Sequence, residues 1–241
     1  MRAVILAGGR GARLAPYTTV IPKPLLPVGD TPILEVVVRQ LVQAGIQHIT
    51  LTLGYQSAYF RAYLAQHQYL SRLATIDFVE EEKPTGTAGS LASVAGLEDT
   101  FLVMNGDILT NLDYRALLGY HASQNAWITI ATHRKLVKID LGVLETNADG
   151  QVVNYIEKPT KDYLVSMGIY VYAPQVLSFI TPGQYLDFPD LVLKLIRAGK
   201  KVVTFANDAT WLDLGRPEDL QRATEIFLER EREFMPPLAN I

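Results

Sequence analysis

Three glycines and two basic side chains near the start of the chain have the residue types and spacing of a phosphate-binding loop. Gly8, Gly9 and Gly11 follow an apolar run, and Arg13 comes shortly after them. Glycine lets backbone N–H groups approach a phosphate chain because no Cβ stands in the way. Arg13 adds a planar fork of donors for phosphate oxygens, and Lys23 stands between two prolines that limit where its ammonium can go. A bare glycine turn with surface basic residues is the simpler alternative, but the combination favours phosphate binding.

Two well-known phosphate motifs do not fit this loop. A P-loop needs Gly-Lys-Ser or Gly-Lys-Thr, which the sequence lacks here. A dinucleotide fingerprint needs a third glycine where the chain has Leu14, and its acidic residue would fall near Asp30, in a turn. An NAD-dependent oxidoreductase is therefore a weak alternative.

Two aspartates follow short apolar runs and could hold a hard cation. Asp107 ends the triplet Asn-Gly-Asp after residues 101–104, and Asp213 follows the strand-like residues 209–212. Carboxylate oxygens at strand ends suit a cation that must also contact phosphates. Either aspartate alone would more readily be a turn residue or a helix cap. Two such aspartates at strand ends make metal binding the alternative to these local roles.

Alternating strands and helices must position these residues. The apolar pattern predicts strands at 2–7, 48–53, 75–80, 101–104 and 127–132, and helices at 33–44 (opened by Thr31-Pro32), 56–66, 89–95 and 112–123. This alternation is typical of a mostly parallel, doubly wound α/β sheet. Ligands of such sheets bind at the carboxyl ends of the strands, where both the glycine loop and Asp107 would lie.

The second half of the chain no longer shows the regular alternation of strands and helices. Its pattern predicts a β-hairpin at 142–157 with Asp-Gly in the turn, strands at 167–172, 201–205 and 209–213, and helices at 188–198 and 217–233. No linker or repeat separates the halves. We therefore expect one domain over 1–241, with a nucleotide half at 1–132 and a substrate half with the C-terminal helix at 133–241.

Composition bounds the possible functions. The chain has 241 residues, 49% hydrophobic and 20% charged, which is the balance of a soluble globular protein. Its net charge of −3 gives no reason to expect nucleic-acid binding. The absence of cysteine excludes disulfides, thiolate zinc sites and cysteine nucleophiles. No apolar stretch is long enough for a signal peptide or a membrane span, so we expect a cytoplasmic protein without a membrane partner.

The chain closely resembles the sugar nucleotidyltransferases over residues 6–34, LAGGRGARLAPYTTVIPKPLLPVGDTPIL. The resemblance continues in order through GTAG at 86–89, NGD at 105–107, EKP at 157–159, GIYV at 168–171 and WLDLGRPED at 211–219. It implies a Rossmann-like α/β domain of the nucleotide-diphospho-sugar transferase type. It also implies Mg²⁺-dependent transfer of a nucleotidyl group from a nucleoside triphosphate to a sugar 1-phosphate, with release of pyrophosphate.

The resemblance assigns roles to individual residues. It implies nucleotide binding by Ala7, Gly8, Gly9, Gly11, Arg13, Glu81 and Gly86, catalysis by Arg13, Lys23 and Asp107, metal binding by Asp107 and Asp213, and sugar-phosphate binding by Gly142, Glu157, Lys158 and Gly168. Glu157 would accept sugar hydroxyls and Lys158 would neutralise the sugar's phosphate, although such a pair is also common as a solvated strand end. Two departures from the family pattern are Ala12, where Thr is usual, and Ser166, where many relatives have Asn.

The base is indicated by an acidic stretch. Glu81 falls where thymidylyl- and uridylyltransferases tend to have glutamine. A carboxylate only accepts hydrogen bonds, and guanine offers N1–H and N2–H as adjacent donors. The GTAG motif also resembles that of guanylyltransferases acting on mannose, heptose or hexosamine 1-phosphates, so GTP is favoured. The alternatives are a glucose-1-phosphate thymidylyl- or uridylyltransferase and, in another class, a non-catalytic sugar-nucleotide sensor.

The final helix leaves the oligomeric state open. Its apolar residues Leu220, Ile226 and Phe227 could pack on the core or on a second subunit of a homodimer.

Overall fold

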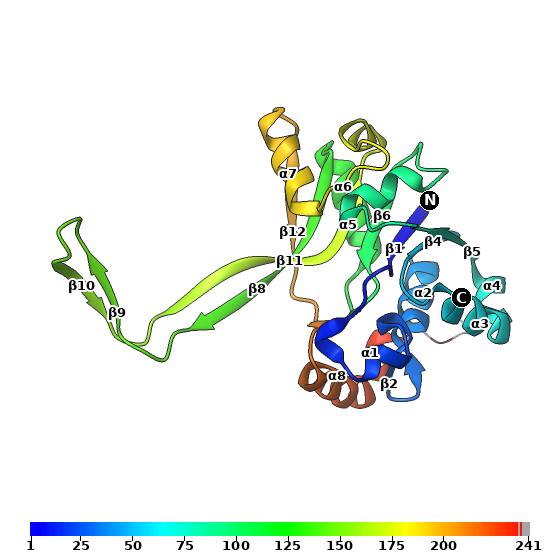
Figure 1. The fold of residues 1–241 in the computed structure, drawn as a ribbon, viewed down its shortest axis with the longest axis horizontal. Coiled ribbons are helices and arrows are strands. Elements are labelled where there is room, and N and C mark those ends of the chain that lie inside the picture. The colour runs from blue at the N-terminus through cyan, green and yellow to red at the C-terminus, as the bar shows by residue number, and fades with distance from the viewer. Residues whose placement is uncertain (236, 238–241) are drawn as a thin grey trace.

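A seven-stranded sheet forms the centre of the molecule (Figure 1). The computed structural model describes residues 1–235 and 237. The strands lie in the order β12 (Val202–Ala206), β8 (Ile128–Lys138), β11 (Thr160–Tyr172), β6 (Phe101–Asn105), β1 (Arg2–Leu6), β4 (His48–Leu53) and β5 (Thr75–Glu80). Neighbouring strands pair in parallel except for β11, which is antiparallel to both β6 and β8.

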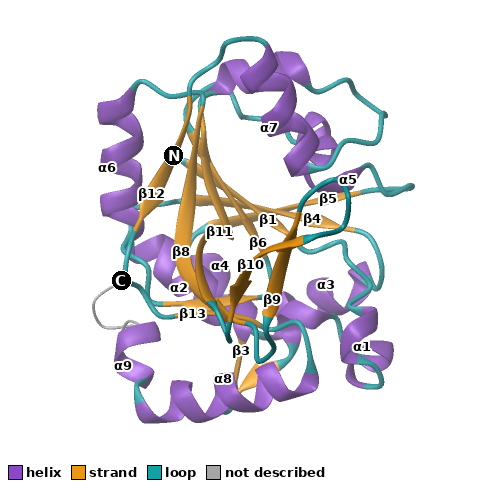
Figure 2. Ribbon diagram, turned by 90° about the vertical axis from the view of Figure 1, so that its left-hand side faces the viewer, coloured by secondary structure: helices purple, strands orange, loops and turns teal. Residues whose placement is uncertain are grey.

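Helices cover both faces of this sheet (Figure 2). They are α1 (Tyr17–Val20), α2 (Ile33–Gln43), α3 (Ser57–Gln66), α4 (Gln68–Leu73), α5 (Gly86–Gly89), α6 (Tyr114–Gln124), α7 (Phe188–Arg197), α8 (Pro217–Glu229) and α9 (Glu231–Phe234), with 3₁₀ turns at Ala12–Leu14, Lys23–Leu25, Ser90–Ser93 and Pro174–Phe179. Short strand pairs complete the fold: β2 (Pro27–Val28) with β3 (Thr31–Pro32), β7 (Ile108–Thr110) with β13 (Trp211–Asp213), and β9 (Val143–Thr146) with β10 (Val152–Ile156).

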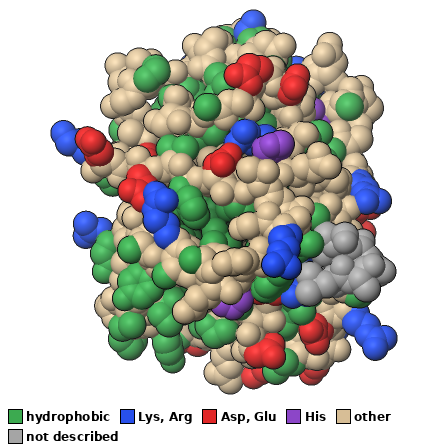
Figure 3. All heavy atoms as spheres, turned by 90° about the vertical axis from the view of Figure 1, so that its right-hand side faces the viewer, with side chains coloured by type: hydrophobic (Ala, Val, Ile, Leu, Met, Phe, Trp, Pro, Cys, Tyr) green, Lys and Arg blue, Asp and Glu red, His purple; other side chains and the backbone are tan. Residues whose placement is uncertain are grey.

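Figure 3 shows the side of the molecule that faces away from β9 and β10. Acidic and basic side chains are interspersed there (Figure 3). No helix in the described part of the chain is long and apolar enough to cross a bilayer.

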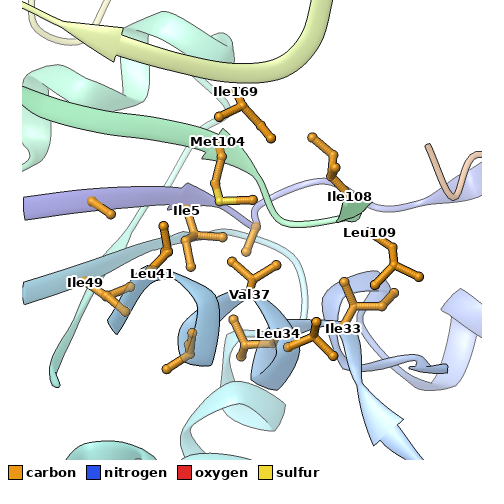
Figure 4. Packing of buried hydrophobic residues seen from close by; sticks show 14 of the residues in the cluster. Ile5, Ile33, Leu34, Val37, Leu41, Ile49, Met104, Ile108, Leu109 and Ile169 are labelled. Carbon is orange, nitrogen blue, oxygen red and sulfur yellow. The ribbon is translucent and has the colours of Figure 1, made fainter. Parts of the chain in front are cut away.

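Alternation along the central strands divides the core into two layers. In β1, Ala3 and Ile5 face one cluster, while Val4 faces the other. The first cluster is covered by α2, α3, α4, α6 and α8, and the second by α5 and α7. Helix α2 sends Val37 and Leu41 toward the strand residues of the first layer (Figure 4). Burying such side chains stabilises the fold by about 1.5–3 kcal/mol each.

This architecture confirms the predicted α/β class with a mostly parallel, doubly wound sheet. Some boundaries differ. Thr31 and Pro32 pair as β3 instead of opening the next helix, and the helix expected at 89–95 begins earlier as α5. The helix expected at 217–233 breaks at Arg230, whose guanidinium bonds to Glu233 in the next short helix.

The largest difference is a long arm that the sequence analysis missed. Strands β8 and β11 run past the sheet as a two-stranded ribbon, with the β9–β10 hairpin at its end (Figure 1). Strand β12 pairs with β8 only as far as Thr132, and β6 pairs with β11 only from Ile169 onward. We call residues 133–166 the arm. Its strands stay in register from Thr132 opposite Ser166 to Lys138 opposite Thr160.

Candidate functional site

A cavity of about 530 Å³ opens at the carboxyl ends of the central strands. The chain order reverses there, since β4 and β5 lie on one side of β1 and β6 lies on the other. Such a reversal leaves a crevice between the loops of neighbouring strands. The cavity is lined by Leu6, Ala7, Gly8, Gly9, Gly11, Ala12, Arg13, Lys23, Pro24, Thr52, Glu81, Pro84, Gly86, Thr87, Ser90, Asn105, Asp107, Tyr185, Asp187 and Gly215. All seven residues predicted to bind the nucleotide are among them.

The glycine loop after β1 is shaped by close packing at two positions. A Cβ on Gly8 would lie 3.4 Å from the backbone nitrogen of Gly54. Gly11 has φ +61°, and a Cβ there would lie 2.8 Å from the Thr18 methyl group. The Thr18 hydroxyl donates a 2.8 Å hydrogen bond to the Gly11 carbonyl and holds the loop in place. Gly9 differs because a Cβ there would meet nothing within 4 Å. The backbone at Gly9 therefore lines the cavity with open space beside it.

A buried lysine and an aspartate form an ion pair beside this loop. Lys23 lies in the 3₁₀ turn between Pro22 and Pro24 and is 8% exposed. Its ammonium donates to the Asp107 carboxylate, whose side chain is about a quarter exposed. Because burial costs an unpaired cation dearly, the carboxylate fixes where the ammonium lies. The two residues are far apart in sequence and both line the cavity.

A second carboxylate lies next to this pair. Strand β13 pairs with β7 so that Asp213 is opposite Ile108, the residue after Asp107. Burial, with the Asp107 carboxylate as the next cause, raises the pKa of Asp213. Carboxylate oxygens are the ligands that a hard divalent cation prefers, and a cation here would favour the charged form of Asp213, so these two residues fit Mg²⁺. Arg13 lies at the same place, 3.5 Å from the Cβ position of Gly215.

The donor set is small. Among residues 1–235 and 237, no three His, Asp or Glu side chains gather in a way that could hold a metal ion. A cation on the two aspartates would therefore keep coordination positions for phosphate oxygens and water, which is how Mg²⁺ usually binds at phosphate-transfer sites.

Glu81 lies on the other side of the cavity, after β5. Its Oε1 accepts hydrogen bonds from the backbone N–H of Thr85, at 3.1 Å, and from the Thr85 hydroxyl. Its Oε2 is directed toward Gly8, 3.5 Å from the Cβ position of that glycine. One oxygen thus holds the loop that leads to Gly86, and the other lines the cavity.

Sequence reasoning missed a pair of residues on this side. The Tyr185 hydroxyl donates a 2.7 Å bond to Asp187 Oδ2, while Asp187 Oδ1 accepts from the backbone N–H of Thr87 at 3.1 Å. Hydrogen bonding from Tyr185 lowers the pKa of Asp187, so this carboxylate stays ionised. Asp187 ties the 185–187 segment onto the GTAG motif, where Gly86 at φ +86° has no room for a Cβ. Asp187 directly precedes Phe188-Pro189 at the start of α7, and this position in the sequence is the feature from which Asp187 could have been noticed.

The residues predicted to bind the sugar phosphate lie in two separate places, one beside the cavity and one at the end of the arm. Gly168 has φ +73° and lies beside the cavity, since a Cβ there would be 2.6 Å from the Asn105 amide nitrogen. Gly142, Glu157 and Lys158 are exposed and lie at the end of the arm, outside the cavity of their own chain. Close packing at Gly142 comes from Tyr155, whose hydroxyl would be 2.1 Å from a Cβ.

Comparison with known proteins gives one answer at the level of family. The model of the family described as "Nucleotidyl transferase" matches residues 2–230. The chain is 34% identical over 92% of its length to a mannose-1-phosphate guanylyltransferase of Mycobacterium tuberculosis, and 31% identical over 96% to a UTP–glucose-1-phosphate uridylyltransferase of Synechocystis. It spans 63% and 64% of the length of these two relatives.

Solved structures agree with this result. A putative glucose-1-phosphate thymidylyltransferase of Bacillus anthracis superposes with a TM-score of 0.74 at 26% identity, covering 94% of both chains. HddC of Yersinia pseudotuberculosis, solved in complex with GMP-PN, gives 0.70 at 26% identity and covers 94% of this chain and 99% of its own. With matched motifs along almost its whole length, this chain belongs to the nucleotidyl transferase family.

Proposed function

We propose that the chain transfers a nucleotidyl group from a nucleoside triphosphate to a sugar 1-phosphate and releases pyrophosphate. The observation that carries the proposal is one cavity that is lined by the glycine loop, Arg13, Lys23 and Asp107. Family membership supports the same reaction.

The reaction needs little acid–base chemistry. A phosphate monoester carries about 1.5–2 negative charges at pH 7, so its oxygen is already a nucleophile. That oxygen forms a bond to the α-phosphorus of the triphosphate while the bond to the bridging oxygen breaks, and pyrophosphate leaves with that electron pair. The difficulty is to bring two anions together in line.

The chain's own residues address this difficulty. Backbone N–H groups around Gly9 hold the triphosphate, and Arg13 and Lys23 offset its charge. Asp107 holds the Lys23 ammonium in place. Asp107 and Asp213 would hold Mg²⁺, which neutralises phosphate charge and aligns the reacting oxygens when it is bound.

We propose GTP as the triphosphate and a mannose, heptose or hexosamine 1-phosphate as the acceptor. Oε2 of Glu81 lines the cavity as an acceptor and matches the adjacent N–H donors of guanine. The relative named a mannose-1-phosphate guanylyltransferase supports this choice. A glucose-1-phosphate uridylyl- or thymidylyltransferase is the second candidate, and the names of the Synechocystis and Bacillus anthracis proteins support it.

The test is pyrophosphate release in Mg²⁺ buffer from GTP, dTTP, UTP, CTP and ATP, each combined with a panel of hexose, hexosamine and heptose 1-phosphates. We expect the strongest signal in the GTP row, and the responding sugar names the acceptor. A signal confined to UTP or dTTP would reject guanine and keep the reaction. Silence across the whole matrix would reject the reaction and favour a sugar-nucleotide sensor.

A further inference from the structure

The arm exposes apolar side chains that residues 1–235 and 237 leave uncovered. Leu136 is 70% exposed and Leu141 is 73% exposed. The register places Leu136 and Leu164 on one face of the ribbon and Val137 and Tyr163 on the other. Apolar groups at the hairpin end are equally open, namely Leu144, Val152, Val153 and Tyr155. Contiguous exposed apolar surface of this kind marks an interaction site.

Both edges of the ribbon are free as well. Beyond Thr132, strand β8 no longer pairs with β12, and β11 pairs with β6 only from Ile169 onward. An isolated two-stranded ribbon is at best marginally stable in water. We therefore expect the arm to be stabilised by packing against a further surface, which the described part of the chain does not provide.

The end of the arm is nevertheless built in detail. The Tyr155 ring packs against Gly142, and its hydroxyl donates a 3.1 Å bond to Glu157 Oε2. Lys158 has φ +45°, a left-handed conformation that disfavours a residue with a Cβ. Backbone strain of this kind gathers at ligand-binding positions. The strained residue is the lysine to which the family resemblance assigns the sugar's phosphate.

This lysine lies far from its own cavity. Strand residues rise by about 3.3 Å each, so the eight steps from Thr160 to Gly168 separate Lys158 from the cavity edge by roughly 25 Å. To return Lys158 to its own cavity, the chain would have to give up the ladder in which Thr160 to Ser166 pair with Lys138 to Thr132.

The cavity, for its part, is short of positive charge. Arg13 and Lys23 are its basic side chains among the described lining residues, and Lys23 is already paired with Asp107. A triphosphate and a sugar phosphate are both multiply anionic. Besides the proposed Mg²⁺, a further basic side chain would help to hold both substrates, and Lys158 at the end of the arm is such a side chain.

From these observations we propose that the arm reaches a second copy of this chain and supplies Glu157 and Lys158 to the sugar-phosphate side of the partner's cavity. In a two-fold dimer each arm would serve the other subunit, which is the isologous arrangement expected of exchanged elements. An interface of standard size uses about 20–30 residues on each side, and the arm of residues 133–166 is long enough for this. The inference rests on the proposed function, because it concerns that reaction's acceptor.

The decisive experiment is complementation between two inactive variants. Asp107→Asn disables the cavity, and Lys158→Ala disables the arm. The two chains are co-expressed with different affinity tags, and the mixed dimer is isolated over both columns. One of its two sites then combines an intact cavity with an intact arm, so we expect about half of the wild-type activity per dimer. At a low, fixed concentration of the sugar phosphate, each variant alone should stay far below this level.

A matched control is Lys161→Ala, which removes an exposed arm lysine close to Lys158. This variant should keep wild-type activity, and Lys158→Ala should raise the KM for the sugar phosphate far more than the KM for the triphosphate. Equal KM changes for both substrates would overturn the assignment of Lys158.

The remaining outcomes separate this proposal from the proposed function. A mixed dimer at background activity, or an active wild type that light scattering shows to be monomeric, would overturn the arm exchange alone. A wild type inactive with every substrate pair would overturn the proposed function and this proposal with it.

Discussion

The cavity and the end of the arm both carry residues that the sequence assigns to phosphate binding, but they are built in opposite ways. In the cavity, Lys23 is buried and held by Asp107, and Gly11 is fixed by Thr18. At the arm's end, Glu157 and Lys158 are exposed and lie in the segment between β10 and β11. The residues predicted to bind the nucleotide therefore line one cavity within a single chain, whereas Glu157 and Lys158, predicted to bind the sugar phosphate, lie outside that cavity.

The sharpest test of this difference substitutes one aspartate in each region. Asp107→Asn removes a carboxylate from the proposed metal site and frees Lys23, so turnover should fall at least about 100-fold. Asp162→Asn breaks only an exposed pair with Arg134, worth below about 1 kcal/mol, and should keep turnover. Pyrophosphate release measures both, and circular dichroism checks that each variant is folded. Similar losses of turnover in the two variants would contradict the different roles assigned to the cavity and the arm.

Two leucines test burial in the same way. Leu41 is fully buried against the first core layer, and Leu41→Ala should cost about 2–5 kcal/mol of unfolding free energy. Leu136→Ala removes little contact within its own subunit. Its effect on the melting temperature should depend on protein concentration, because the surface that covers Leu136 would belong to a second copy. A large, concentration-independent loss at Leu136 would show that the arm packs on its own chain.

Two left-handed glycines separate local strain from packing. Gly150, in the turn of the arm's hairpin, has φ +79° with nothing within 4 Å of a Cβ, whereas a Cβ on Gly11 meets Thr18 at 2.8 Å. Both Gly→Ala changes should cost about 1–2 kcal/mol for the backbone conformation. Gly11→Ala should cost more in urea denaturation and should also raise the KM for the triphosphate. If Gly150→Ala were the more damaging change, the glycine loop would not be the better packed of the two.

The smallest expected effect concerns the base. In Glu81→Gln the amide oxygen can keep the Thr85 bonds, while the cavity-facing atom becomes a donor. We expect the ratio of kcat/KM for GTP over UTP to fall about tenfold, equivalent to about 1.4 kcal/mol. Thr85→Ala is the companion variant, since it loosens Glu81 without changing its charge. An unchanged ratio in Glu81→Gln would mean that another group reads the base.

The cavity was accessible to sequence reasoning because buried parallel strands leave a clear pattern. Residues 2–7 and 101–104 are nearly continuous apolar runs, so their ends could be placed within a residue of Leu6 and Asn105. Once those ends are known, the edge of the sheet brings the glycine loop and Asp107 together.

The arm was inaccessible for a physical reason. Residues 133–138, His-Arg-Lys-Leu-Val-Lys, have neither an apolar run nor strict alternation of apolar and polar residues. The reason is that both faces of the ribbon are exposed to solvent when a single chain is considered. The strand was therefore predicted to end at Thr132, although it continues to Lys138. The cavity residues Tyr185 and Asp187 were missed because they come from a loop, and their place depends on contacts with Thr87.

The position of β1 in the sheet has a consequence for the order in which the protein is made. The neighbour on one side, β4, ends at Leu53, but β6 on the other side is not finished until Asn105. A ribosome adds about 5–20 residues per second, so β1 waits several seconds in the nascent chain with one edge open. The glycine loop leaves β1 at that boundary, and the cavity needs residues as late as Gly215. A nucleotide that binds in this cavity, as proposed, would assist only late stages of folding during synthesis, because the lining is incomplete until Gly215 has been added.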